Sequence, residues 1–208
     1  SKLASQGYYC LRFDYHGTGD SSGQFEQVDL NTWQQDINDA CTELRSTAGC
    51  EQILCIGVRL GAALALQANT QCHFNEFIFW DPIFEGQHYL QQLNELQTQV
   101  LKQNWHFSIV RDPSDLSTHE LLGYNYNALL QQQLKELSLS NKLLALTTPF
   151  TIIHTGPHNL LNEIKPQNTK DSVTIKHIND EGGWEAQQDI DRSISTHNIN
   201  QFILETLS

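Results

Sequence analysis

The residues best placed to do chemistry lie in a glycine-framed turn from Gly57 to Gly61, which reads Gly-Val-Arg-Leu-Gly. An apolar run without alternation, from Ile53 to Ile56, stops at Gly57, and a small-residue helical pattern begins at Gly61. This order is typical of a buried strand, a tight turn and a helix. Glycines flank such a turn because the middle residue has a strained backbone and because strand and helix approach closely. The middle residue of this turn is Arg59.

Arg59 cannot perform the chemistry of the serine that occupies the middle of a Gly-x-Ser-x-Gly turn. A guanidinium has a pKa above about 12 and is neither a nucleophile nor a general base at neutral pH. It can hold an anion, because the amino end of the following helix already favours negative charge. A cation at this position requires a partner, which is either a strand-end aspartate in a structural ion pair or an anionic ligand.

Asp81 and His177 are the candidate catalytic side chains. Asp81 follows an apolar run at the carboxyl end of a predicted central strand, where ligands bind in open α/β sheets. It is either an orienting acid or the partner of Arg59, and the second is favoured because the two strand ends would be neighbours. His177 is a possible general base, although a histidine in a strand is more often a neutral packed or exposed residue.

His16, His154 and Trp184 are expected to line the pocket. His154 and His158, with His16 nearby, could also be interpreted as a metal cluster, but their spacing matches no known ligand pattern. We therefore expect no metal and no cofactor. Cys55 falls inside the strand before the turn, where a buried thiol is expected to be inert.

The elements that must position these residues form an alternating series of strands and helices. Continuous apolar runs predict the strands, and recurrence at three and four positions predicts the helices. Such a series is typical of the α/β class with a mainly parallel, doubly wound sheet. The predicted strands are Tyr8–Phe13, Ile53–Ile56, Phe77–Trp80, Pro149–Ile153 and Val173–Ile178, with helices at Val28–Ser46, after Gly61 and at Asp189–Leu207.

A helical segment interrupts this series and divides the chain into three parts. Residues 1–86 form the first part of the core, residues 87–146 a helical cap insert, and residues 147–208 the second part of the core. The insert is rich in Gln, Asn and Leu, with predicted helices near Tyr89–Gln103 and Asn125–Leu139 and a short strand or buried loop at Trp105–Val110. It is either a lid or an elaborated helix pair that merely packs on the sheet.

Charge and cysteine content limit the partners and the compartment. The 208 residues carry a net charge of -12 without a basic run, which argues against nucleic acid or an anionic membrane as a partner. No apolar window reaches the length of a membrane span. The five cysteines have no C-x-x-C pair, which favours reduced thiols in a cytoplasm. The expected partner is a small acyl or anionic molecule, and nothing in the sequence indicates the oligomeric state.

The segment from Leu11 to Gly23, which reads Leu-Arg-Phe-Asp-Tyr-His-Gly-Thr-Gly-Asp-Ser-Ser-Gly, adds a resemblance to a known family. Together with the glycine-framed turn it resembles the α/β-hydrolase superfamily, close to the serine-aminopeptidase-like hydrolases. Within these it is most similar to the exosortase A system-associated hydrolases of bacteria, whose turn reads Gly-x-Arg-x-Gly. The resemblance implies that the strand ending at Asp14 is the fourth of eight. The chain would then be a fragment without the first three strands, with apolar surface exposed.

The resemblance also assigns positions to a catalytic triad, and only one of three is filled. Arg59 stands at the nucleophile position, and residues 179–184, where the base is expected, contain no histidine. Residues 154–159 contain no carboxylate, but Asp81 matches an acid position that some relatives use. The resemblance implies a hydrolase of ester, thioester or amide bonds with a degenerate triad. The residues favour the alternative, a catalytically inactive pseudo-hydrolase that binds an anionic or acyl ligand or a protein partner.

Overall fold

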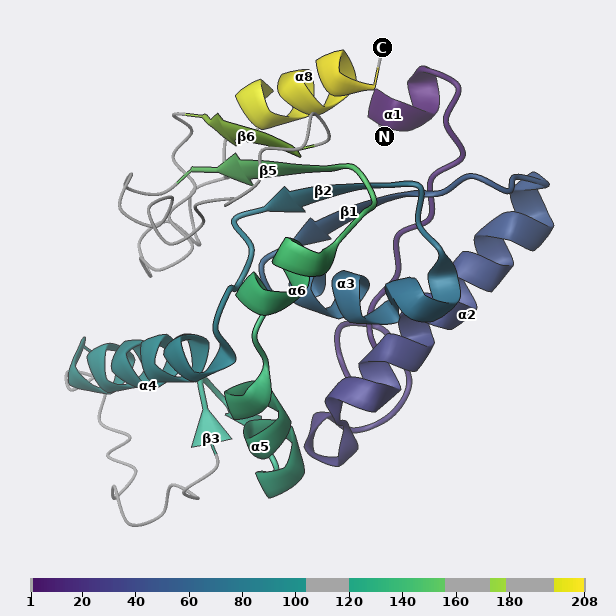
Figure 1. The fold of residues 1–208 in the computed structure, drawn as a ribbon. Coiled ribbons are helices and arrows are strands. Elements are labelled where there is room, and N and C mark those ends of the chain that lie inside the picture. Colours follow the sequence, from purple (N-terminus) through teal and green to yellow (C-terminus); the bar gives the residue numbers. More distant parts are fainter. Residues whose placement is uncertain (1, 104–119, 156–172, 179–196, 208) are drawn as a thin grey trace.

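A four-stranded parallel sheet forms the centre of the protein (Figure 1). The structure is a computed structural model that describes residues 2–103, 120–155, 173–178 and 197–207. The strands lie in the order β1-β2-β5-β6, and each neighbouring pair is parallel. This confirms the predicted α/β class and its mainly parallel sheet. The four strands are β1 (Leu54–Val58), β2 (Glu76–Trp80), β5 (Phe150–His154) and β6 (Val173–His177).

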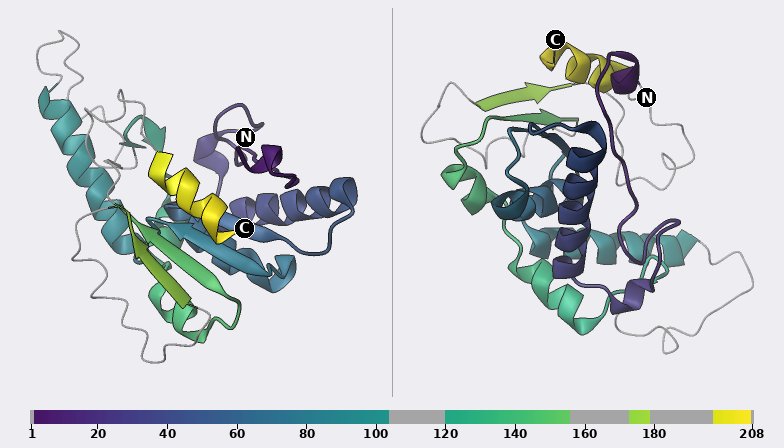
Figure 2. Two further views of the ribbon diagram at one scale, coloured as in Figure 1. Left: turned by 90° about the horizontal axis from the view of Figure 1, so that it is seen from above. Right: turned by 90° about the vertical axis from the view of Figure 1, so that its right-hand side faces the viewer.

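Helices cover both faces of this sheet, as Figures 1 and 2 show. One face packs on α2 (Leu30–Ala48) and α3 (Leu60–Cys72), and its core includes Phe77 and Phe79 of β2. The other face packs on α8 (His197–Thr206), and its core includes Ile78 of β2. Because successive side chains of a strand point to opposite faces, the apolar run of β2 supplies both cores. This two-sided burial explains why the run from Phe77 to Trp80 shows no polar alternation.

Helix α2 has clear signals at both ends. Asp29 caps its beginning, where the carboxylate accepts a hydrogen bond of 2.7 Å from the backbone N–H of Thr32. Gly49 ends it in the left-handed conformation with φ of 62°. Trp33, Ile37 and Cys41 recur at helical spacing and are buried in the core that α2 shares with α3.

The segment between β2 and β5 contains α4 (Gly86–Gln103), α5 (Ala128–Glu136) and α6 (Ser140–Ala145), with a short hairpin of β3 (Glu120–Leu121) and β4 (Tyr124–Asn125). Backbone hydrogen bonds join the start of this segment to residues near its end. The Gly86 N–H donates to the Leu137 carbonyl at 2.9 Å, and the Leu139 N–H donates to the Phe84 carbonyl at 2.7 Å. The Asn127 side chain donates to the carbonyl of Val28, which ties α5 to the chain ahead of α2. The three-part division and the lid role remain predictions, and Trp105–Val110 lies outside the described residues.

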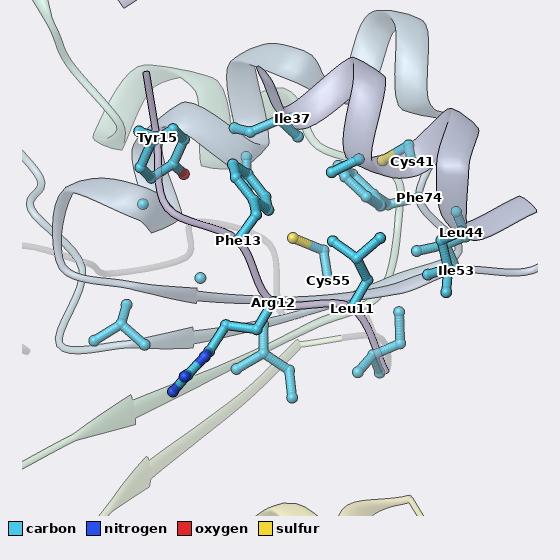
Figure 3. A pocket seen from close by; sticks show the side chains of 17 residues that line it. Leu11, Arg12, Phe13, Tyr15, Ile37, Cys41, Leu44, Ile53, Cys55 and Phe74 are labelled. Atoms are coloured by element: carbon cyan, nitrogen blue, oxygen red, sulfur yellow. The ribbon is translucent and has the colours of Figure 1, made fainter. Parts of the chain in front are cut away.

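The predicted strand at Tyr8–Phe13 is wrong. In the described chain this segment follows α1 (Lys2–Ser5) and is extended, but it pairs with no strand. An extended segment becomes a strand only when a neighbour satisfies its N–H and C=O groups. Leu11 and Phe13 point to one side and Arg12 to the other (Figure 3), so the alternation of a strand is present without its ladder. A cavity of about 320 Å³ lies between this segment, β1 and α2.

Candidate functional site

The turn after β1 holds Arg59 in a conformation that few side chains adopt. Arg59 has φ of 52° and ψ of -122°, a region that costs a non-glycine residue about 1–3 kcal/mol. Backbone hydrogen bonds hold it there. Its N–H donates to the carbonyl of Trp80 at 3.0 Å, and its own carbonyl accepts from Ala62 at 3.2 Å and Ile83 at 3.3 Å. The strained turn of a nucleophile elbow is therefore present, with an arginine at its apex.

The two framing glycines have different roles. A methyl group on Gly57 would lie 2.6 Å from the Cα of Ala62 in α3, so the strand and the helix are too close for any side chain there. A methyl group on Gly61 would meet only the Tyr15 hydroxyl at 3.7 Å, an ordinary contact. We expected close approach to explain both glycines, and in the structure it explains Gly57 alone.

The guanidinium of Arg59 does not form the expected ion pair with Asp81. Its Nη1 donates to the backbone carbonyl of Asp81 over a long 3.5 Å, and no carboxylate within the described ranges contacts it. Its charge acts on Tyr89 of α4. Burial raises the pKa of the Tyr89 hydroxyl, while a hydrogen bond with Tyr126 and the charge of Arg59 act in the opposite direction. Most of the five N–H donors of the guanidinium are therefore unused by the described part of the protein.

The carboxylate of Asp81 binds His154 and Thr155 instead. His154 Nδ1 lies 3.0 Å from Asp81 Oδ1, the Thr155 N–H donates to the same oxygen at 2.8 Å, and the Thr155 hydroxyl donates to Oδ2. Asp81 is 5% exposed and His154 is 6% exposed. The pairing follows from the sheet, because β2 and β5 are neighbours and both residues lie at carboxyl ends of these strands.

The sequence predicted His154 as a pocket-lining residue, and this buried acid–histidine pair was missed. The signal was available: Asp81 follows one fully apolar run and His154 ends another. The two runs are adjacent only because β2 and β5 are neighbours in the sheet, and the sequence pattern does not contain that strand order. His177 lies beside His154 in the register of β5 and β6, with ring centroids 6.1 Å apart. The candidate base is therefore near the pair, in the next strand.

Of the other predicted pocket residues, His16 lies in the loop after Asp14 and Trp184 lies outside the described residues. The backbone N–H of His16 donates to Asp36 at 2.8 Å, and its ring packs so closely on Gly23 that a methyl group there would lie 2.2 Å from Nε2. His16 therefore takes part in ordering its own loop, and its role in lining a pocket at Arg59 stays a prediction. His158 also lies outside the described residues. In the described chain, no group of three His, Cys, Asp or Glu side chains could hold a metal ion.

Comparisons with known proteins point to one family. Residues 1–162 match the family described as Serine aminopeptidase, S33. A segment of 64 residues is 41% identical to the mitochondrial palmitoyl-protein thioesterase ABHD10 of Homo sapiens and of Pongo abelii. This segment is 31% of the chain and spans only 20% of the length of those relatives.

Three solved structures share the fold. A protein from Agrobacterium vitis S4 has a TM-score of 0.57 and 18% identity, over 97% of this chain and 78% of that one. Est1E from Butyrivibrio proteoclasticus, solved with ferulic acid bound, has a TM-score of 0.55 and 15% identity, over 93% and 75%. Mouse alpha/beta hydrolase domain-containing protein 10 has a TM-score of 0.52 and 15% identity, over 95% and 78%.

Proposed function

The chain belongs to the serine aminopeptidase (S33) family of α/β-hydrolases, and we propose that it binds an anionic acyl compound at Arg59 without forming a covalent acyl-enzyme. The observation that carries this proposal is the Arg59 guanidinium, which occupies the apex of the strained turn and has no carboxylate partner in the described chain. Acyl transfer on this fold depends on an activated nucleophile at that apex. An arginine there supplies a fixed positive charge in its place.

The site supports the anionic part of this proposal, and the relatives support the acyl part. Arg59 lies at the amino end of α3, whose dipole adds to the attraction for an anion. The matched curated relatives are thioesterases that act on palmitoyl-protein, and the local similarity extends that class of substrate to this chain as a proposal. A carboxylate or the anionic product of an acyl ester would satisfy the guanidinium with charge-assisted hydrogen bonds.

A second candidate, a hydrolase of ester, thioester or amide bonds, is favoured by the Asp81–His154 pair. A histidine held by a buried carboxylate is the arrangement that keeps a general base in one tautomer and orientation. With His154 as the base, a water molecule would take the place of the missing serine, and Arg59 would stabilise the developing oxyanion. This mechanism also forms no acyl-enzyme, so the two candidates differ only in turnover.

A binding experiment on the 208-residue chain tests the proposal. Isothermal titration with decanoate and with its uncharged methyl ester is expected to show binding of the carboxylate, weakened about tenfold to hundredfold in Arg59→Gln, because a hydrogen bond to a charged group is worth about 1.5–3 kcal/mol. Arg12→Gln is the matched control and is expected to bind normally. Equal affinity of wild type and Arg59→Gln for decanoate would refute the anion site.

Turnover distinguishes the second candidate from the first. With p-nitrophenyl decanoate, the ligand-binding proposal predicts no hydrolysis above the uncatalysed rate. Steady hydrolysis that is lost in His154→Asn would establish the hydrolase instead.

The narrower predictions rest on the sequence alone. These predictions are membership of the exosortase A system-associated subgroup, a cytoplasmic location and, as an alternative to a small ligand, a protein partner. None of the helices in the described part of the chain is both long and apolar enough to cross a bilayer.

A further inference from the structure

One asparagine fastens the segment between β2 and β5 to the chain ahead of α2. Asn127 lies at the beginning of α5, where its Oδ1 accepts a hydrogen bond of 2.8 Å from the Leu130 N–H. Its Nδ2 donates to the carbonyl of Val28 at 2.7 Å and to that of Glu26 at 3.0 Å. The side-chain amide therefore caps α5 with its oxygen and holds the neighbouring chain with both of its donors.

A second contact runs from α5 to the first turn of α2. The first N–H groups of a helix have no partner within that helix. In α2, the N–H of Leu30 donates instead to Gln133 Oε1 of α5 at 2.7 Å. Side chains of α5 thus satisfy the beginning of α2 as well as the beginning of α5 itself.

Apolar packing accompanies these hydrogen bonds. The ring centroid of Phe25 lies 4.9 Å from that of Tyr124 and 5.0 Å from that of Tyr126, two residues just ahead of α5. Three aliphatic side chains at the same contact are fully buried: Val28, Leu130 and Leu134. Lifting α5 away from α2 would break the hydrogen bonds of Asn127 and Gln133 and expose this apolar surface to water, so opening is costly.

The beginning of α4 is held against the same helix. A methyl group on Gly86, the first residue of α4, would collide with the carbonyl of Leu134, so α4 and α5 are in direct contact there (Figure 1). The N–H of Ile83, three residues earlier, donates to the Arg59 carbonyl at 3.3 Å. The chain beside the Arg59 turn is therefore continuous with a helix that packs on α5.

We propose that the insert is a fixed wall and does not open as a lid, because Asn127 and Gln133 fasten α5 to the beginning of α2. On this proposal α5 separates from the core only when the first turns of α2 open as well. The packed helix pair is thus favoured over the lid, and the chain beside Arg59 keeps one arrangement.

Hydrogen exchange of the full 208-residue chain, followed by mass spectrometry, tests this coupling. The comparison is between residues 130–136 of α5 and residues 30–36 of α2, with exchange rates expressed as protection factors. One shared opening exposes both segments, so their protection factors are expected to agree within about tenfold. A lid opens while α2 stays closed, so a protection factor of α5 more than about tenfold below that of α2 would overturn the proposal.

Asn127→Asp separates the fastening from the helix cap. Aspartate caps a helix as well as asparagine does, but it offers no donor to the carbonyls of Val28 and Glu26. Protection of α5 is expected to fall about tenfold to hundredfold, because two hydrogen bonds are lost. The matched control is Asn94→Asp, whose amide donates to the Leu90 carbonyl within α4. Equal protection of α5 in wild type and Asn127→Asp would contradict the fastening role.

Gln133→Met removes the other contact and keeps the length of the side chain. The Leu30 N–H loses its acceptor, so protection of residues 30–36 and 130–136 is expected to fall together, by about twofold to tenfold for one hydrogen bond. Residues 62–68 of α3 serve as the internal reference and should keep their protection. A loss confined to α5 would show that the two helices open independently and would overturn the proposal.

Discussion

Asp81 is the residue on which the arrangement of the site depends most. Its buried carboxylate accepts from Thr155 twice and contacts His154, and its own backbone has φ of 41°. Charges buried in this way persist only when hydrogen bonds satisfy them. Asp81 therefore joins β2 to β5 at the carboxyl edge of the sheet, and it does so independently of Arg59.

Replacing this carboxylate by an amide tests that role. Asp81→Asn keeps the shape but turns one acceptor oxygen into an NH₂ group that faces donors, which should lower the free energy of unfolding by about 1–3 kcal/mol. Asp39→Asn is the matched control, because Asp39 is exposed on α2 and its side chain accepts a hydrogen bond from Gln35. Urea unfolding measures both, and an equal effect of the two substitutions would contradict the structural role of Asp81.

The framing glycines allow a paired test of the turn. Gly57→Ala places a methyl group 2.6 Å from the Cα of Ala62 and is expected to lower the free energy of unfolding by about 1–3 kcal/mol through overpacking. Gly61→Ala has room, lies within α3 and is expected to be neutral or stabilising by up to about 1 kcal/mol. Thermal unfolding of the two variants should therefore shift in different directions, and a larger loss for Gly61→Ala would show that the turn is built differently.

Among the helices, α2 offers the clearest dependence on pH. Burial raises the pKa of its capping residue Asp29, but the hydrogen bonds of Thr32 and Gln133 outweigh it, so the pKa lies below its ordinary value. A carboxyl whose pKa is lowered on folding stabilises the protein above its unfolded pKa of about 3.9, and this stabilisation is lost as pH falls through the folded value.

Asp29→Ala is therefore expected to cost about 1 kcal/mol near pH 7, where the cap is ionised. The difference from wild type should shrink as pH falls below about 4. Denaturant unfolding at pH 7 and pH 3 measures it. Asp36→Ala, about two turns into the same helix, removes the acceptor of a hydrogen bond from the His16 N–H without removing the cap. A difference for Asp29→Ala that grows toward acid would contradict the cap assignment.

The elements were predictable where one local pattern decided the outcome. Continuous apolar runs identified β1, β2 and β5, and the spacing of Trp33, Ile37 and Cys41 identified α2. The Tyr8–Phe13 strand failed because an aromatic and apolar run describes side chains, whereas a strand also requires a paired backbone. The Asp81–His154 pair was missed for a related reason, since it depends on which strands are neighbours and no local pattern contains that information.

The whole molecule combines a regular sheet with an apolar surface beside β1. Tyr8, Tyr9, Leu11 and Phe13 are 37% to 72% exposed, and the last two also border the cavity that β1 lines. Contiguous apolar surface of this kind is typical of an interaction site or of a surface that another segment covers. Arg59, Asp81 and His154 lie at the carboxyl ends of β1, β2 and β5, and residues of β2 and β5 belong to both hydrophobic cores.

Labelling of the full chain with a fluorophosphonate tests the central claim most directly. The reagent forms a covalent bond only with a serine that a neighbouring base activates. With Arg59 at the apex of the turn, we predict no stoichiometric mass increase, either for wild type or for His154→Asn, while decanoate binding remains intact in the wild type. A stoichiometric adduct mapped to any serine would contradict the account, because the nucleophile would then lie outside the turn that Arg59 occupies.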